Sequence, residues 1–199
     1  MPEPLEHTGS VEFAHLDGKV AVIRLIGRCS FQNSAYLEKA AEICERDIGP
    51  CSYVFDLDHC TYMDSTFLGA LAGIALRQRR LGRGNLIAVN VPPLLWRTML
   101  LLGLTHVLDI RERRPEGQPN EEIAVHEADK IEMSRTEQVA HMIQAHRQLI
   151  EVDSGNEVRF NDVLKYLEDS LARARAEHES VKDNASSSPQ PTPNPDPAQ

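Results

Sequence analysis

Apolar positions in the first half of the chain switch between strand-like and helix-like spacing. The alternating segment Val11 to Leu16 and the β-branched run Lys19 to Ile26 flank an Asp17-Gly18 turn, which predicts a β-hairpin. From Ser34 to Ile48 apolar side chains recur at intervals of three and four, and Gly49-Pro50 follows. This spacing predicts a helix that ends at the glycine.

Strand and helix patterns continue to alternate as far as Ile110. The other elements expected in this region are strands at 52–57, 85–90 and 106–110 and helices at 65–80 and 93–102. Strands separated by helices pair in parallel through crossovers, whereas the opening hairpin adds an antiparallel pair. Residues 10–110 are therefore expected to form one α/β domain, a single mixed β-sheet flanked by helices.

The chain after residue 110 falls into three further segments. Residues 111–133 are charged, contain proline and glycine and lack periodicity, which predicts a linker. Residues 134–179 carry two apolar helical repeats, and the first begins with a capping-box pattern from Ser134 to Glu137, so a helical hairpin extension is expected. Residues 180–199 are rich in serine and proline, which predicts a disordered tail.

Composition and charge narrow the classes of function. The chain has 21 Lys and Arg against 30 Asp and Glu, and its net charge of −9 argues against nucleic-acid binding, which needs clustered cations. No apolar run is long enough to span a bilayer, and the N-terminus lacks the pattern of a signal peptide, so a cytoplasmic protein without membrane insertion is expected. The four cysteines form no C-x-x-C pair, so buried free thiols are expected, with no metal site and no cofactor.

A short polar cluster, Asp64-Ser65-Thr66, lies where a predicted strand gives way to a predicted helix. Backbone N–H groups at a helix start lack partners, so Asp, Ser and Thr side chains there accept hydrogen bonds from them. A phosphate added at the same place meets a favourable helix dipole. The cluster is therefore interpreted either as a helix cap or as a phosphorylation switch, with its hydroxyls exposed at the corner.

The helix that follows this cluster carries two glycines on the side away from its predicted core face. Gly69 and Gly73 share that side with Arg80, Ser65 and Thr66, whereas Phe67 is predicted to enter the core. Each glycine in an exposed helix costs about 1 kcal/mol relative to alanine, so something is expected to approach this face closely. Two explanations are weighed equally: a partner protein, or the chain's own 134–179 hairpin.

An ordered series of residues in this region resembles a known family. The series is Val54-Phe55-Asp56-Leu57, Cys60, Met63-Asp64-Ser65-Thr66, Leu68-Gly69, Gly84, Ala88-Val89-Asn90-Val91-Pro92-Pro93 and Leu102-Gly103-Leu104. It looks like the STAS domain of bacterial anti-sigma factor antagonists, over roughly residues 10–110. Two positions depart from the family pattern. Phe67 stands where many members have glycine, and Gly27-Arg28-Cys29-Ser30 replaces a Gly-x-Leu-Asp pattern.

The resemblance implies a regulator that acts by partner switching rather than an enzyme. On this match Ser65 is the phosphoacceptor, Thr66 is the second choice and Asp64 is the acidic neighbour. Unphosphorylated members bind an anti-sigma factor Ser/Thr kinase and so free the sigma factor. Phosphorylation breaks that contact, and a metal-dependent Ser/Thr phosphatase restores it. The expected partner-binding residues are Asp64, Ser65, Thr66, Gly69, Gly73 and Arg80.

Two other classes of function are considered. An enzyme would need a nucleophile and a base, and Ser65 with His59 is the only nearby pair, without a Gly-x-Ser-x-Gly motif. His141 and His146 lie five residues apart, do not share a helix face, and are interpreted as surface or partly buried histidines. The alternative to the switch is a STAS adaptor or scaffold without phosphotransfer, in a sensory complex or a lipid-transport system.

Overall fold

The computed structural model describes residues 9–16, 19–111, 126–128 and 130–186, with only the backbone described over 177–186. Its centre is one mixed β-sheet with the strand order β6-β5-β3-β2-β1-β7, and β4 pairs with β2 beside this path. The strands are β1 (Ser10–Leu16), β2 (Val20–Cys29), β3 (Ser52–Asp56), β4 (Cys60–Met63), β5 (Leu86–Val89), β6 (Leu108–Arg111) and β7 (His126–Glu127). The helices are α1 (Ser34–Ile48), α2 (Ser65–Arg80), α3 (Pro93–Leu101), α4 (Arg135–Val152) and α5 (Asn156–Ser186), with a 3-10 turn η1 (Leu104–His106).

The sheet has the predicted mixture of pairings. β1 and β2 form the antiparallel hairpin, whereas β2, β3, β5 and β6 pair in parallel through helical crossovers. The main core lies between the sheet and its helices, where Ile23, Phe55 and Phe67 are fully buried. A smaller cluster on the other face contains Val22, Val54 and Val89. Phe67 thus enters the core, as its position on α2 predicts.

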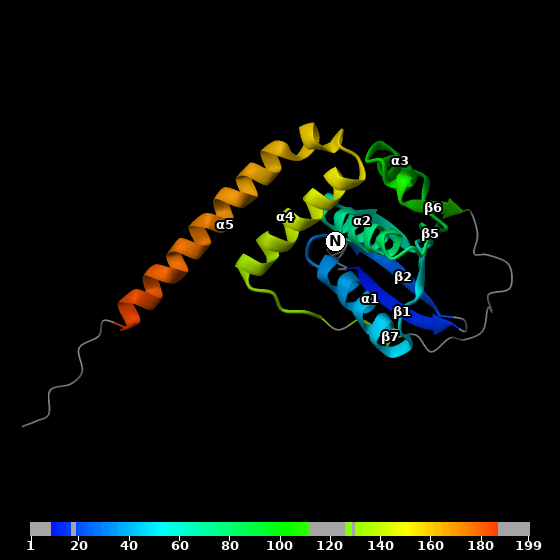
Figure 1. Ribbon diagram of the computed structural model, residues 1–199, viewed down its shortest axis with the longest axis horizontal. Coiled ribbons are helices and arrows are strands. Elements are labelled where there is room, and N and C mark those ends of the chain that lie inside the picture. The colour runs from blue at the N-terminus through cyan, green and yellow to red at the C-terminus, as the bar shows by residue number, and fades with distance from the viewer. Residues whose placement is uncertain (1–8, 17–18, 112–125, 129, 187–199) are drawn as a thin grey trace, which may run out of the picture.

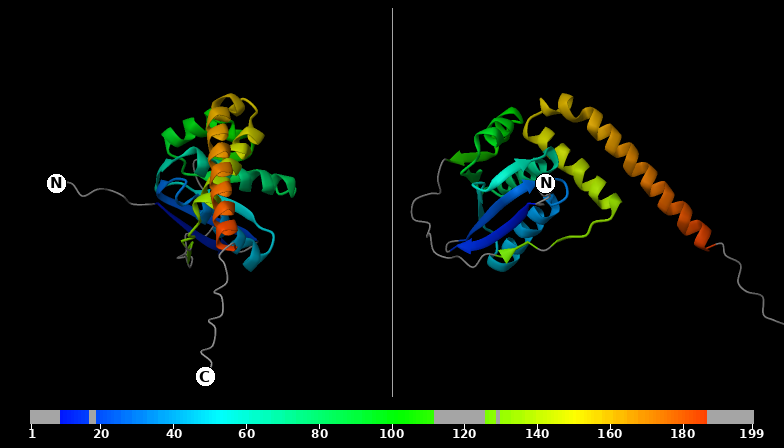
Figure 2. Two further views of the ribbon diagram at one scale, coloured as in Figure 1. Left: turned by 90° about the vertical axis from the view of Figure 1, so that its left-hand side faces the viewer. Right: turned by 180° about the vertical axis from the view of Figure 1, so that it is seen from behind.

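The two C-terminal helices stack outside this core. Figure 1 shows α4 crossing over α2, and Figure 2 shows α5 extending away from the sheet as it diverges from α4. The predicted capping box at the start of α4 is present: the Ser134 hydroxyl accepts from the Glu137 backbone N–H at 3.3 Å, and the Glu137 carboxylate accepts from Ser134 N–H at 2.8 Å. The order is therefore sheet, α2, α4 and then α5.

Several boundaries differ from the sequence prediction. Two strands were not predicted: β4, which extends the sheet immediately before α2, and β7, which lies in the expected linker and pairs with β1. β6 begins at Leu108 rather than residue 106 because η1 takes up the preceding residues. Helix α5 continues to Ser186, past residue 180, at which the tail was expected to begin, since no proline interrupts the sequence between Asn156 and Pro189. The rest of that predicted tail, 187–199, and linker residues 112–125 and 129 lie outside the described residues.

Within the described part of the chain, no helix combines the length and the apolar character that crossing a bilayer requires. All four cysteines are free and buried, as their pattern predicts.

Candidate functional site

The start of α2 is fixed by Asp64, whose side chain uses both of its oxygens. Asp64 Oδ1 accepts from the Phe67 backbone N–H at 2.9 Å and so caps the helix. Asp64 Oδ2 accepts from the Phe31 N–H at 2.8 Å, and the Asp64 N–H donates to the Cys29 carbonyl at 3.1 Å. This carboxylate therefore joins the first turn of α2 to the loop that follows β2, and it holds the next residue, Ser65, in place.

The two hydroxyls after Asp64 are less accessible than the sequence predicted. Thr66 is only 2% exposed, so the expectation of an exposed hydroxyl at this position is wrong. Ser65 is partly buried, and its Oγ lies 3.0 Å from Nε2 of His146 on α4. The helical repeat predicts both hydroxyls on the outer side of α2, but another helix of the same chain, α4, covers that side.

His146 is held in one neutral form by its surroundings. Its Nδ1 lies 2.7 Å from the Met142 carbonyl oxygen, which can only accept, so Nδ1 carries the hydrogen and Nε2 accepts from Ser65. Burial lowers the pKa of His146, which is 3% exposed. Phe160 of α5 packs its ring edge-on against the imidazole, with the ring centroids 4.9 Å apart. The Ser65–His146 contact is thus a partly buried, directional hydrogen bond.

A second histidine of α4 makes a similar contact with the start of α1. Nε2 of His141 lies 2.8 Å from the hydroxyl oxygen of Ser34, and its Nδ1 lies 3.7 Å from the Glu38 carboxylate. Burial raises the pKa of that carboxyl. Ser34 and Ser65 are the first residues of α1 and α2, so α4 meets both helix N-termini through a histidine. The sequence prediction of scattered histidines missed this arrangement. Its only sequence signal is that His146 falls within the apolar repeat of α4.

The glycine side of α2 is the contact surface for α4. A Cβ added to Gly69 would lie 2.2 Å from the Ala145 carbonyl oxygen, and one added to Gly73 would lie 2.3 Å from the Gln148 side chain. A side chain at position 69 would therefore push the two helices apart, whereas one at position 73 would require the Gln148 side chain to move. Of the two explanations for these glycines, coverage by the chain's own hairpin is the one found in this structure.

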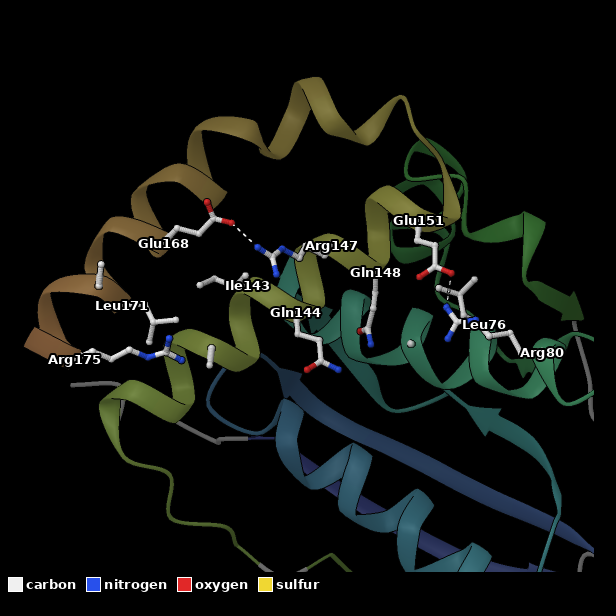
Figure 3. A pocket seen from close by; sticks show the side chains of 13 residues that line it. Leu76, Arg80, Ile143, Gln144, Arg147, Gln148, Glu151, Glu168, Leu171 and Arg175 are labelled. Carbon is white, nitrogen blue, oxygen red and sulfur yellow. Dashed lines mark hydrogen bonds and ion pairs between the residues drawn. The ribbon is translucent and has the colours of Figure 1, made fainter.

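Ion pairs connect the outer edges of the three stacked helices. Arg80 of α2 pairs with Glu151 of α4, and Arg147 of α4 pairs with Glu168 of α5 at 2.7 Å. Figure 3 shows both pairs along an open groove of about 730 Å³ whose walls come from α2, α4 and α5. Arg80, predicted as a partner-binding residue, is exposed and lies at one end of this groove.

The predicted Ser65–His59 pair is not formed. His59 is exposed, and its Nε2 lies 3.7 Å from the Asp58 carboxylate. The histidine that Ser65 contacts is His146. A neutral histidine that accepts from a serine hydroxyl is also the start of a nucleophile–base pair. The groove of Figure 3, however, is lined by neither Ser65 nor His146. In this structure the pair serves as a hydrogen bond that joins the start of α2 to α4.

Fold and site together define a small α/β domain with a serine at the start of α2 and an additional helical pair packed over it. The family profile of the STAS domain matches residues 13–117, just over half of the chain, and the chain belongs to the STAS-domain family.

Two solved structures are similar in fold at low identity. One is the anti-sigma factor antagonist SpoIIAA in its unphosphorylated form, at 14% identity and a TM-score of 0.43, covering 52% of this chain and 89% of that one. The other is the Bacillus cell fate determinant SpoIIAA in the phosphorylated form, at 16% identity and a TM-score of 0.42, covering 52% and 92%. No curated protein matches the chain. The α4–α5 extension lies outside the STAS match.

Proposed function

We propose that this protein is a phosphorylation-switched regulator, an anti-sigma factor antagonist that binds a kinase-type anti-sigma factor when Ser65 is unmodified. The observation that carries the proposal is the position of Ser65. It is the first residue of α2, directly after the Asp64 cap, and it borders a glycine stripe against which another helix packs closely. A helix start accommodates a phosphate, and the stripe accommodates a helix.

Charge supplies the switching energy in this proposal. A phosphate adds about −1.5 to −2 charges at neutral pH, next to the Asp64 carboxylate, on a surface that makes helix–helix contacts. A loss of about 1.4 kcal/mol lowers affinity tenfold, so a modest repulsion is sufficient to release a partner. A metal-dependent Ser/Thr phosphatase would reset the site, and transcription would be the regulated process in a bacterial cytoplasm.

The direct test combines the protein with a candidate anti-sigma kinase and ATP, and then locates the phosphate by mass spectrometry. Phosphate is expected on Ser65, and Ser65→Asp is expected to bind the kinase more weakly than wild type does. Thr61→Ala is the matched control, because Thr61 is an exposed hydroxyl on β4 just before the site. Modification at another residue with Ser65 untouched, or wild-type binding by Ser65→Asp, would reject the proposal.

A second candidate is a STAS adaptor that works without phosphotransfer, in a sensory complex or with membrane ATPase subunits of a lipid transporter. The burial of Thr66 and the covering of Ser65 by α4 favour it, because a permanently covered serine is not a substrate. Protein purified from its own cells distinguishes the two functions. The adaptor predicts stable co-purification with the complex and no phosphate on Ser65, whereas the switch predicts a modified fraction.

A further inference from the structure

We infer that the stripe formed by Ser65, Gly69 and Gly73 is a docking surface for a single helix, and that α4 is its built-in occupant. A partner that uses this surface must therefore displace α4 and present a helix of the same kind. The inference rests on the proposed function only where it names a kinase-type partner, since the occupancy of the surface by α4 is independent of that partner.

The shape of the surface specifies the kind of helix that fits. Opposite Gly69 the occupant presents Ala145, whose backbone approaches so closely that even a methyl group on Gly69 would overlap it. Opposite Ser65 the occupant presents a hydrogen-bond acceptor, Nε2 of His146. Two apolar residues of the same helix, Ile143 and Leu149, are buried beside these contacts. A competing helix therefore needs a small residue, an acceptor and an apolar edge at the same spacing.

The contact between α2 and α4 also has features that would allow another helix to replace α4. Oε1 of Gln148 is buried against Gly73 without a hydrogen-bond partner, and such an atom costs on the order of 1–3 kcal/mol. The Arg80–Glu151 pair at the edge is half exposed, where an ion pair contributes about 0–1 kcal/mol. What favours α4 is its attachment to the same chain, because an attached segment acts at an effective concentration on the order of millimolar.

Phosphorylation and docking of α4 exclude each other at Ser65. The Ser65 oxygen lies 3.0 Å from a buried imidazole nitrogen, a separation that holds one hydrogen and no phosphoryl group. Transfer of the γ-phosphoryl group of ATP to the Ser65 oxygen, with release of ADP and loss of the hydroxyl proton, therefore requires α4 to leave first, and the phosphoserine prevents its return. A kinase-type partner would both displace α4 and gain access to its substrate hydroxyl in one step.

Thiol labelling of a Ser65→Cys protein measures this exposure without any kinase. The four native cysteines are buried, so a small maleimide reagent reports on position 65. In the full-length chain, the substitution Ala145→Leu adds bulk to α4 at the contact with Gly69 and leaves the STAS surface unchanged. Labelling at position 65 is expected to accelerate by at least about tenfold, which corresponds to a shift of about 1.4 kcal/mol. Gln138→Leu, at an exposed position of the same helix, is the control and is expected to have no effect.

Three further measurements test the inference, and the His146→Ala variant keeps it testable if Ala145→Leu alters the whole fold. Hydrogen exchange should show α4 amides losing protection while the amides of β3 and β5 keep theirs. His146→Ala in the Ser65→Cys chain should also accelerate labelling. A synthetic peptide of residues 134–152 should then slow the labelling of the Ala145→Leu protein and leave the labelling rate of the Ser65→Cys parent unchanged.

The inference is overturned if labelling is equally fast with and without the α4 substitutions, or if the peptide has no effect on the opened protein. Accelerated labelling combined with no phosphorylation of Ser65 by any candidate kinase would keep the docking surface and reject the proposed function. The two proposals therefore fail on different results.

Discussion

Replacing Gly69 by alanine tests the α2–α4 contact at its closest point. The new Cβ would lie 2.2 Å from the Ala145 carbonyl oxygen, 2.5 Å from its carbonyl carbon and 2.7 Å from its Cβ. Two of these atoms are backbone, so they cannot move aside without moving α4. In the matched variant Gly73→Ala, the three atoms nearest to the new Cβ belong to the end of the Gln148 side chain, which can rotate away.

The expected change in stability differs between the two positions. Alanine is favoured over glycine within a helix by about 1 kcal/mol, and this gain applies to both variants. At Gly69 it is opposed by overpacking, which costs typically about 1–3 kcal/mol. Gly69→Ala is therefore expected to be neutral or to destabilise by up to about 2 kcal/mol, whereas Gly73→Ala is expected to stabilise by up to about 1 kcal/mol.

Urea unfolding of the full-length variants measures the difference, and hydrogen exchange shows where it acts. Gly69→Ala should reduce amide protection in α4 and leave the sheet unchanged, whereas Gly73→Ala should leave both unchanged. If Gly69→Ala is as stabilising as Gly73→Ala and α4 keeps its protection, then α4 does not pack on α2 as described, and the docking inference fails with it.

Three further outcomes follow from individual side chains. Because burial lowers the pKa of His146, the unfolded chain binds a proton at this residue more readily than the folded chain does. The contribution of neutral His146 to stability is therefore fully present above about pH 6.5 and is lost as the pH falls toward the folded-state pKa. Thermal unfolding at a series of pH values should show a smaller loss of stability at low pH for His146→Gln than for wild type. The Asn156 side-chain amide donates to the Leu102 and Leu149 carbonyls at 2.9 and 2.8 Å. Asn156→Ala should therefore lower the free energy of unfolding in urea by on the order of 1–3 kcal/mol. An unchanged unfolding midpoint would argue against this link between α3, α4 and α5. Asp64→Ala should remove the α2 cap and lower the free energy of unfolding by about 0.5–2 kcal/mol. The control Asp58→Ala, at an exposed position, should be near neutral. Equal urea unfolding midpoints for the two variants would contradict the capping role.

Local patterns in the sequence predicted most of the helices and strands of the STAS domain. The apolar repeat and the Gly49 stop gave the bounds of α1, and the polar cluster at Asp64 gave the start of α2. These features depend on neighbouring residues alone, because capping and periodicity act over one or two helical turns. The capping box of α4 and the entry of Phe67 into the core were predicted on the same basis.

Short strands were harder to predict, because pairing across the sheet stabilises them more than their own residues do. β7 contributes only His126 and Glu127, both exposed, and it is defined by its register against β1. β4 has four residues, of which Thr61 and Tyr62 are exposed, so no apolar run marks it in the sequence. Neither strand carries a signal that sequence periodicity can detect.

For the glycines of α2, the sequence determined only part of the answer. It placed Gly69, Gly73 and the hydroxyls on one side of the helix and required a close neighbour there, but it could not choose between a partner and the chain's own hairpin. That choice depends on a contact between Ser65 and His146, which are 81 residues apart, and on the backbone of Ala145 fitting against Gly69. Such contacts follow from how two finished helices pack, and helical periodicity fixes which side of a helix is available but not which segment comes to cover it.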